Sequence, residues 1–147
     1  MIKLLDANDV EEIMEYILDN NEENSLVING GVFRDISIVR YMLFHTRLVC
    51  IADVDKKIEK LFAVLTPQED SPDCSLYLVA TSYDKEFISE ALEVVSEIFE
   101  DKYKKVKLLS AEKASEDLKK VYANIGFGFE LEISTMNSHK AIYSRFM

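Results

Sequence analysis

Apolar side chains in the first part of the chain follow the period of a helix. After a short apolar run at residues 2–5, the apolar positions of residues 10–18 keep the i, i+3, i+4, i+7, i+8 spacing of a one-sided helix. Asn8 and Glu11 have the spacing of a capping box. The pattern therefore predicts a short strand and then a helix that begins near Asp9.

A second helix and three strands are predicted next. Helical spacing returns over residues 32–43, behind a Gly-Gly break at 30–31. Three β-rich runs then follow, over residues 48–54, 58–66 and 74–81. A short polar turn separates the first two, and a stretch that contains proline and acidic residues separates the last two. Short connections favour pairing between neighbours, so these runs predict an antiparallel three-stranded meander.

The second half alternates between the two periods. Residues 88–99 show the pattern of an amphipathic helix, and residues 106–109 that of a short buried strand. A last helix over 118–125 is closed by Gly126, where a left-handed residue is favoured. The next apolar positions alternate as in a strand: Phe127, Phe129, Leu131 and Ile133. Residues 141–146 can pair back onto this strand.

The order β-α-α-β-β-β-α-β-α-β-β predicts an α/β (α+β) fold. Its mixed, mostly antiparallel sheet would have about seven strands and four flanking helices, in one domain over residues 1–147. Cys50 and Cys74 lie in apolar, strand-like runs and are predicted to be reduced core residues. No apolar run approaches ~18 residues, and residues 1–6 lack a signal-peptide core, so we expect a cytoplasmic protein with no membrane span.

Charge and glycine content narrow the function. The net charge of −10 disfavours nucleic acid and anionic membranes as partners and suits a cationic small molecule or a basic protein. Only 4 glycines are present, although loops that bind phosphates usually need them. His45 and His139 lie far apart and outside any metal-ligand motif, so no metal is expected.

The element order and three segments resemble the GNAT superfamily of acyl-CoA-dependent N-acetyltransferases. The likeness in order covers essentially the whole chain. Its segments are Tyr77-Leu-Val-Ala-Thr-Ser-Tyr83, Tyr103-Lys-Lys-Val-Lys-Leu108 and Val121-Tyr122-Ala-Asn-Ile-Gly126-Phe127. The last is similar to the LYxxxGF segment of that family and is the most specific of the three.

The resemblance implies a site for acetyl-CoA. In the family, the backbone of the fourth strand binds the pantetheine arm, and the following Arg/Gln-x-x-Gly-x-Gly/Ala loop binds the pyrophosphate at a helix N-terminus. The gapless match to that loop is residues 84–89. The positions that correspond to cofactor contacts are Val79, Thr81, Lys85, Phe87, Ile88, Ser89 and Ser115.

The residues of this loop depart from the family pattern. Asp84 places a carboxylate where the family has a cation or an amide, and Phe87 places a ring on the approach that glycine keeps open. Lys85 could return some attraction for phosphate as a flexible point charge. Ser115 could contact the cofactor or act as a helix N-cap.

The resemblance also implies a catalytic acid. Tyr122 matches the position that protonates the departing thiolate, although its spacing also suits a residue of the helix's apolar face. The spacing of Asp53, Asp73 and Glu132 does not select one of them as the base. We therefore expect an N-acetyltransferase that acts on a primary amine, of a small molecule or a basic protein. The alternative is a catalytically inactive binding module, and a homodimer could form through residues 141–146.

Overall fold

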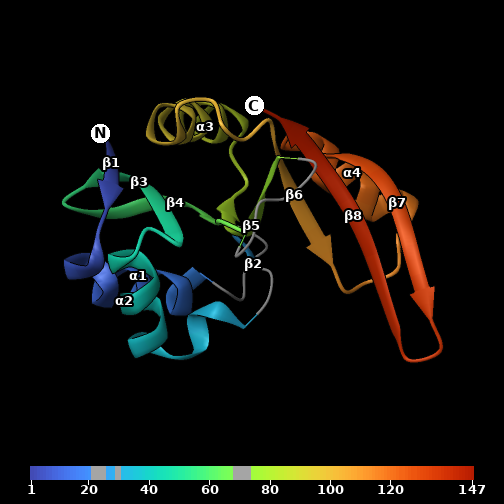
Figure 1. Ribbon diagram of the computed structural model, residues 1–147, viewed down its shortest axis with the longest axis horizontal. Helices are drawn as coiled ribbons and strands as arrows, with labels where there is room; N and C mark the ends of the chain where they lie inside the picture. The colour runs from blue at the N-terminus through green and yellow to red at the C-terminus, as the bar shows by residue number, and fades with distance from the viewer. Residues whose placement is uncertain (21–25, 29–30, 68–73) are drawn as a thin grey trace.

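One sheet runs through the fold and carries helices on both faces (Figure 1). The computed structural model describes residues 1–20, 26–28, 31–67 and 74–147. The strands are β1 (Ile2–Leu5), β2 (Leu26–Ile28), β3 (Leu48–Asp55), β4 (Lys57–Leu65), β5 (Ser75–Ser82), β6 (Lys105–Ser110), β7 (Gly128–Thr135) and β8 (Ser138–Phe146). Their spatial order is β1-β3-β4-β5-β6-β8-β7, with β2 on β5, and among these described strands only β5 and β6 pair in parallel.

The helices are those that the periodicity predicts. They are α1 (Val10–Asn20), α2 (Ile36–Phe44), α3 (Lys85–Phe99) and α4 (Glu116–Asn124), with 3₁₀ turns η1 (Ala7–Asp9) and η2 (Val32–Arg34). The predicted mixed, mostly antiparallel sheet with four helices is therefore confirmed. The sequence did not predict β2, because three residues are too few to show a period-2 alternation.

The sheet opens between β5 and β6. These strands pair only where Ser75–Tyr77 lies beside Lys105–Lys107, at the start of each strand. Further along β5, Thr81 pairs with Phe62 of β4 on one edge and with Val27 of β2 on the other. Because a strand has two edges, β2 occupies the edge that β6 has left.

Two apolar cores lie on opposite faces of the sheet. α1 and α2 pack on one face, with Ile13 and Val39 fully buried against β3 and β4. α3 and α4 cover the other face through a stripe at helical spacing on α3: Phe87, Ile88, Ala91, Leu92 and Val95. Burial of each large apolar side chain contributes about 1.5–3 kcal/mol to the stability of the fold. Both pairs of helices therefore stabilise the sheet in which the opening lies.

The first helix is capped two residues earlier than the sequence predicts. The carboxylate of Asp6 accepts the N–H of Asn8 at 2.8 Å, and the N–H of Asp6 donates to the Asp9 carboxylate at 2.9 Å. Because η1 precedes α1, the capping box is Asp6 with Asp9, rather than Asn8 with Glu11. On the same helix, Leu18 is exposed instead of part of the apolar face.

Gly126 ends α4 as predicted. Its φ of 89° lies in the left-handed region, and its N–H donates to Ala123 O at 2.9 Å. The N–H of Phe127 reaches back to Tyr122 O at 3.0 Å, which completes a Schellman motif. This turn fixes the direction in which the chain enters β7.

A β-bulge divides the C-terminal hairpin. Phe129 is paired with Tyr143 but Leu131 with Ile142, so the register shifts between Phe129 and Leu131. The predicted simple alternation is therefore wrong beyond Phe129: the apolar residues Leu131 and Ile133 turn to the other face, where they stay exposed. β8 pairs on both edges within the chain, with β6 and β7, so it is not a free edge for a second copy.

One smaller prediction fails. Cys50 is fully buried as expected, which raises the pKa of its thiol, but Cys74 is exposed, with a φ of 51° just before β5. The two histidines lie in separate elements, His139 within β8 and His45 as the C-cap of α2.

Candidate active site

A cavity of about 650 Å³ lies at the opening between β5 and β6. It is on the α2 side of the sheet, since Met42 and Val79 in its wall belong to the core beneath α1 and α2. β6 and the start of β8 form the opposite wall. The residues that define the cavity include Met42, Arg47, Val79, Leu109, Ser110 and Lys140.

Tyr122 approaches this cavity from the other side of the sheet. It is 7% exposed on α4 and belongs to the core beneath α3 and α4. Burial raises the pKa of its phenol, and a side-chain hydrogen bond with Ser110 opposes that rise. Because Ser110 also lines the cavity, it connects the phenol to the cavity wall. A phenol that stays protonated in this position can act as a proton donor.

Two further tyrosines surround Tyr122. The ring of Tyr143 lies 4.5 Å from that of Tyr122 and is fully buried. Its hydroxyl has no hydrogen-bond partner among the described residues. Tyr83 is half-buried. Its burial raises the pKa of its phenol, and the neighbouring Tyr122 makes a smaller contribution in the same direction. The opening of the sheet therefore holds three phenols that favour the neutral form.

The N-terminus of α3 holds its own carboxylate. Asp84 is the N-cap, and its Oδ1 accepts the N–H of Phe87 at 2.9 Å. Its Oδ2 accepts from Lys60 Nζ at 2.6 Å. The bond from Lys60, and then that from the Phe87 N–H, lowers the pKa of Asp84, while the bond to Asp84 raises the pKa of Lys60. A phosphate at this helix end would compete with a permanent internal anion.

The other loop residues face away from such a phosphate. Phe87 is 3% exposed and lies in the α3 core, so its ring does not cover the loop as the sequence predicts. Ile88 is fully buried, and its N–H donates to Asp84 O. Ser89 donates to Lys85 O and accepts a hydrogen bond from Arg145. Lys85 is exposed at the first position of α3.

The remaining predicted cofactor positions lie in different settings. Val79 lies in β5 between the segments that pair with β6 and with β2, and it faces the cavity. Thr81 is fully buried and is paired on both edges. Ser115 is the N-cap of α4 and accepts from Leu118 N–H at 3.1 Å.

The two candidate bases in the described part of the chain do not reach the cavity. Asp53 pairs with the amino group of Met1 at 2.8 Å. Glu132 accepts the N–H of Ala114 at 3.1 Å. Neither carboxylate lines the cavity, and Asp73 lies outside the described residues.

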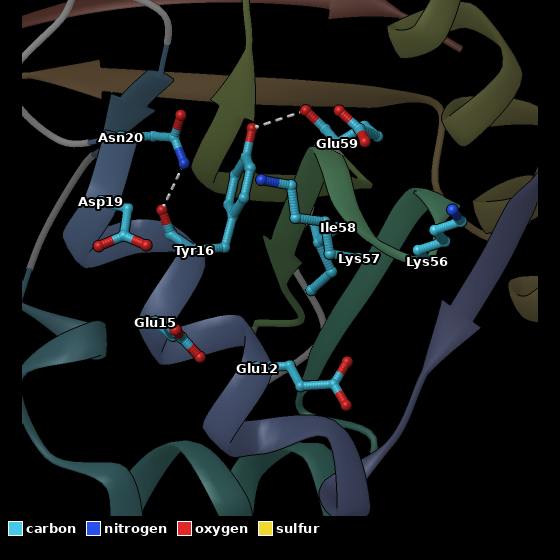
Figure 2. Close-up of a pocket in the computed structure, with 9 residues that line it drawn as sticks. All are labelled: Glu12, Glu15, Tyr16, Asp19, Asn20, Lys56, Lys57, Ile58 and Glu59. Carbon is cyan, nitrogen blue, oxygen red and sulfur yellow. Dashed lines mark hydrogen bonds between the residues drawn. The ribbon is translucent and has the colours of Figure 1, made fainter.

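A second hollow, of about 410 Å³, lies between α1 and the β3–β4 turn (Figure 2). Tyr16 crosses it and donates to Glu59 O at 3.2 Å, while Asn20 donates to Tyr16 O at 2.8 Å. Four carboxylates line it: Glu12, Glu15, Asp19 and Glu59. The acidic side chains therefore gather on this hollow and not on the larger cavity.

The described part of the chain holds neither a cluster of metal ligands nor a membrane-spanning helix. Among those residues, no cluster of three or more histidine, cysteine or acidic side chains is arranged to hold a metal ion. No described helix is long and apolar enough to cross a membrane.

Sequence reasoning missed three residues of this region. Lys60, Ser110 and Arg47 come from separate elements, and no local motif joins them to Asp84, Tyr122 or Val79. The role of Asp84 did carry a signal, because Asp directly before a helical pattern is a typical N-cap.

These features together define the GNAT N-acetyltransferase fold, which this chain has. Two solved structures illustrate the likeness over whole chains. A probable acetyltransferase from Staphylococcus epidermidis matches with a TM-score of 0.68 and 11% identity, covering 100% of this chain and 98% of that one. Ribosomal-protein-S5-alanine acetyltransferase from Vibrio fischeri matches with a TM-score of 0.61 and 16% identity, covering 99% and 91%.

A third similar structure is spermidine N-acetyltransferase SpeG from Vibrio cholerae, with a TM-score of 0.63 and 13% identity, covering 99% of this chain and 94% of that one. No family model and no curated protein matches the sequence. At these identities the likeness establishes the fold, and the function has to be argued from the site.

Proposed function

We propose that this protein is a GNAT-type N-acyltransferase that moves an acetyl group from acetyl-CoA to a primary amine. The position of buried Tyr122 beside Ser110 carries the proposal, since the Ser110 side chain opposes the rise in the pKa of the phenol and also lines the cavity of about 650 Å³. The amine would enter from the α2 side, and the thioester from the side of α3 and α4. The two reactants would meet at the opening between β5 and β6.

In this reaction the amine nitrogen bonds to the thioester carbon and the carbon–sulfur bond breaks. The departing thiolate takes a proton, which Tyr122 supplies because burial keeps its phenol neutral. The ammonium loses one proton to solvent before the attack. The nitrogen loses a second proton as the amide forms, and this proton restores the phenol of Tyr122, so that the net release is one proton. Positioning of the two reactants in one opening supplies much of the remaining acceleration.

The pyrophosphate end of acetyl-CoA fits this chain poorly. The Asp84 carboxylate already holds the N–H of Phe87, and β2 already pairs with the edge of β5 at Thr81. The backbone near Val79 and the ammonium of Lys85 remain as contacts for the donor. We therefore propose weak binding of acetyl-CoA, at higher concentrations than a glycine-rich loop would need.

The same two observations favour a second candidate, a GNAT-fold binding module without catalysis. Titration calorimetry of the full chain with CoA separates the two. Micromolar binding excludes a module that has lost the CoA site, whereas no heat and no thermal shift at millimolar CoA excludes the enzyme.

The role of Tyr122 has its own test in an acetyl-transfer assay. Tyr122→Phe should lower kcat about 100-fold, the contribution of a general acid, with little change in CoA affinity. Tyr41→Phe, an exposed change on α2, is the matched control. An unchanged kcat in Tyr122→Phe removes this phenol from the reaction.

A further inference from the structure

The charged side chains that line the larger cavity, among the described residues, are basic, whereas the whole chain is acidic. The protein carries a net charge of −10, yet the charged side chains among the described residues of the cavity wall are Arg47 and Lys140, with His139 beside them. The separate, smaller hollow is lined by four carboxylates together with Lys56 and Lys57. Net charge therefore does not predict the ligand of this cavity, because a ligand responds to the local field.

Arg47 is held in place by its backbone. Its N–H donates to Met42 O at 2.8 Å, and its carbonyl accepts the N–H of Thr66 at 3.0 Å. Its side chain is partly buried, and its guanidinium has neither an ion pair nor a hydrogen bond with any described residue. A partly buried guanidinium at a cavity wall offers its N–H donors to a ligand, and a carboxylate fits its planar fork with two parallel bonds.

Lys140 and His139 line the cavity from β8, on a different element from Arg47. Both lie at the start of β8, where Lys140 pairs with Ile133 and His139 with Ser134. His139 Nδ1 is 2.9 Å from Ser134 Oγ, which orients the ring. The rest of the lining is mainly apolar, from Met42, Leu65, Val79 and Leu109.

We propose that the cavity binds a small molecule with an apolar body and a carboxylate, held by Arg47 with support from Lys140. If the proposed acetyl transfer is correct, this molecule is the acceptor, so it also carries the primary amine that faces Ser110 and Tyr122. A hydrophobic amino acid is the simplest compound of that class. A volume of about 650 Å³ suits a ligand of this size. The cationic acceptor that the overall charge suggests would meet like charges here.

Direct binding tests the cavity without any acyl donor. Titration calorimetry of the full chain would compare 3-phenylpropanoate, which has the carboxylate alone, phenethylamine, which has the amine alone, and spermidine. We expect 3-phenylpropanoate to bind most tightly of the three. Equal or tighter binding of either amine overturns the proposal, as does the absence of binding by 3-phenylpropanoate at millimolar concentrations.

Substitution of Arg47 tests the assigned contact. Arg47→Met keeps the length and apolar stem and should weaken 3-phenylpropanoate about tenfold or more, whereas Arg47→Lys should lose less. Arg40→Met on exposed α2 is the matched control, with unchanged binding. Thermal melts confirm that each variant is folded. Unchanged binding in a folded Arg47→Met variant overturns the assignment.

The two proposals fail in different ways. Binding of 3-phenylpropanoate without acetylation of phenylalanine or any other amine supports this cavity and contradicts the acyltransferase. Acetylation of spermidine in preference to phenylalanine supports the acyltransferase and contradicts the carboxylate-bearing acceptor.

Discussion

Asp84 Oδ2 lies 2.6 Å from Lys60 Nζ, so β4 supplies the counterion to the carboxylate that caps α3. The second oxygen of Asp84 takes the N–H of Phe87. The cation and the backbone N–H donor that an anion site needs are thus both present, but the Asp84 carboxylate already occupies them. This relationship explains how a helix N-terminus in the position of a phosphate site can be stable without a phosphate.

Removal of the Asp84 charge should strengthen CoA binding. Asp84→Asn keeps an efficient N-cap but releases Lys60 and removes the repulsion of phosphate. We expect CoA affinity to rise severalfold in calorimetry. The loss of stability should be small, because exposed ion pairs contribute about 0.2–1 kcal/mol. Glu86→Gln, an exposed acid in the same turn, is the control for charge alone, and an equal gain there contradicts a specific role for Asp84.

The same pair predicts a dependence of stability on acid. The hydrogen bonds that the Asp84 carboxylate accepts from Lys60 and from the Phe87 N–H lower the pKa of Asp84 from its ordinary value of 3.8. A carboxyl with a lowered folded-state pKa stabilises the fold above its unfolded pKa, and that contribution is lost as pH falls through the folded pKa. Denaturant unfolding of the wild type and Asp84→Asn should therefore differ most near neutral pH and converge below pH 3.8. A constant difference contradicts the assignment.

Ser110 should control the titration of Tyr122. Because its hydrogen bond opposes the effect of burial, Ser110→Ala should raise the pKa of Tyr122 further. The ultraviolet difference absorbance of tyrosinate measures this, with Tyr122→Phe as the reference that identifies the signal. A pKa of Tyr122 that falls in Ser110→Ala would contradict the link between the cavity wall and the phenol.

The unpaired hydroxyl of Tyr143 predicts a substitution that does not weaken the fold. A buried polar group without a partner is unfavourable by about 1–3 kcal/mol, so Tyr143→Phe should leave the free energy of unfolding unchanged or raise it by about 1 kcal/mol. Denaturant unfolding measures the difference. A clear loss of stability would mean that this hydroxyl has a partner in solution.

Gly126 and Gly128 form a matched pair for the turn after α4. A Cβ at Gly126 would lie 2.7 Å from Arg145 Nη1, at a φ of 89°. A Cβ at Gly128 would have no neighbour within 4 Å. Gly126→Ala should therefore destabilise the fold by about 1–2 kcal/mol or more, and Gly128→Ala by much less. Equal effects in denaturant unfolding would contradict the role of the left-handed turn.

The helices and longer strands could be predicted because their patterns are local. The stripe on α3 and the turn at Gly126 depend on residues a few positions apart, and both are found where the sequence places them. β2 could not be predicted, since its only support is the distant edge of β5. The bulge after Phe129 could not be predicted either, because an inserted residue leaves the apolar pattern unchanged while it turns side chains to the other face.

The candidate site was predicted less completely than the fold. Tyr122 could be found because a local segment carries it. Its partner Ser110, and the cation Lys60 beside Asp84, are joined to the site only by tertiary pairing. The charge of the larger cavity was hidden for the same reason, because Arg47 and Lys140 meet from distant parts of the chain.

The bulge in the C-terminal hairpin separates a part that packs on the core from a part that lines the larger cavity. Before it, Phe129 packs against the ring of Tyr143 at 5.6 Å and is tied to the core. Beyond it, the exposed start of β8 contributes Ser138 and Lys140 to the cavity wall and nothing to that core. If the cavity binds the proposed ligand, exchange of the hairpin tip should alter the choice of ligand with little loss of stability.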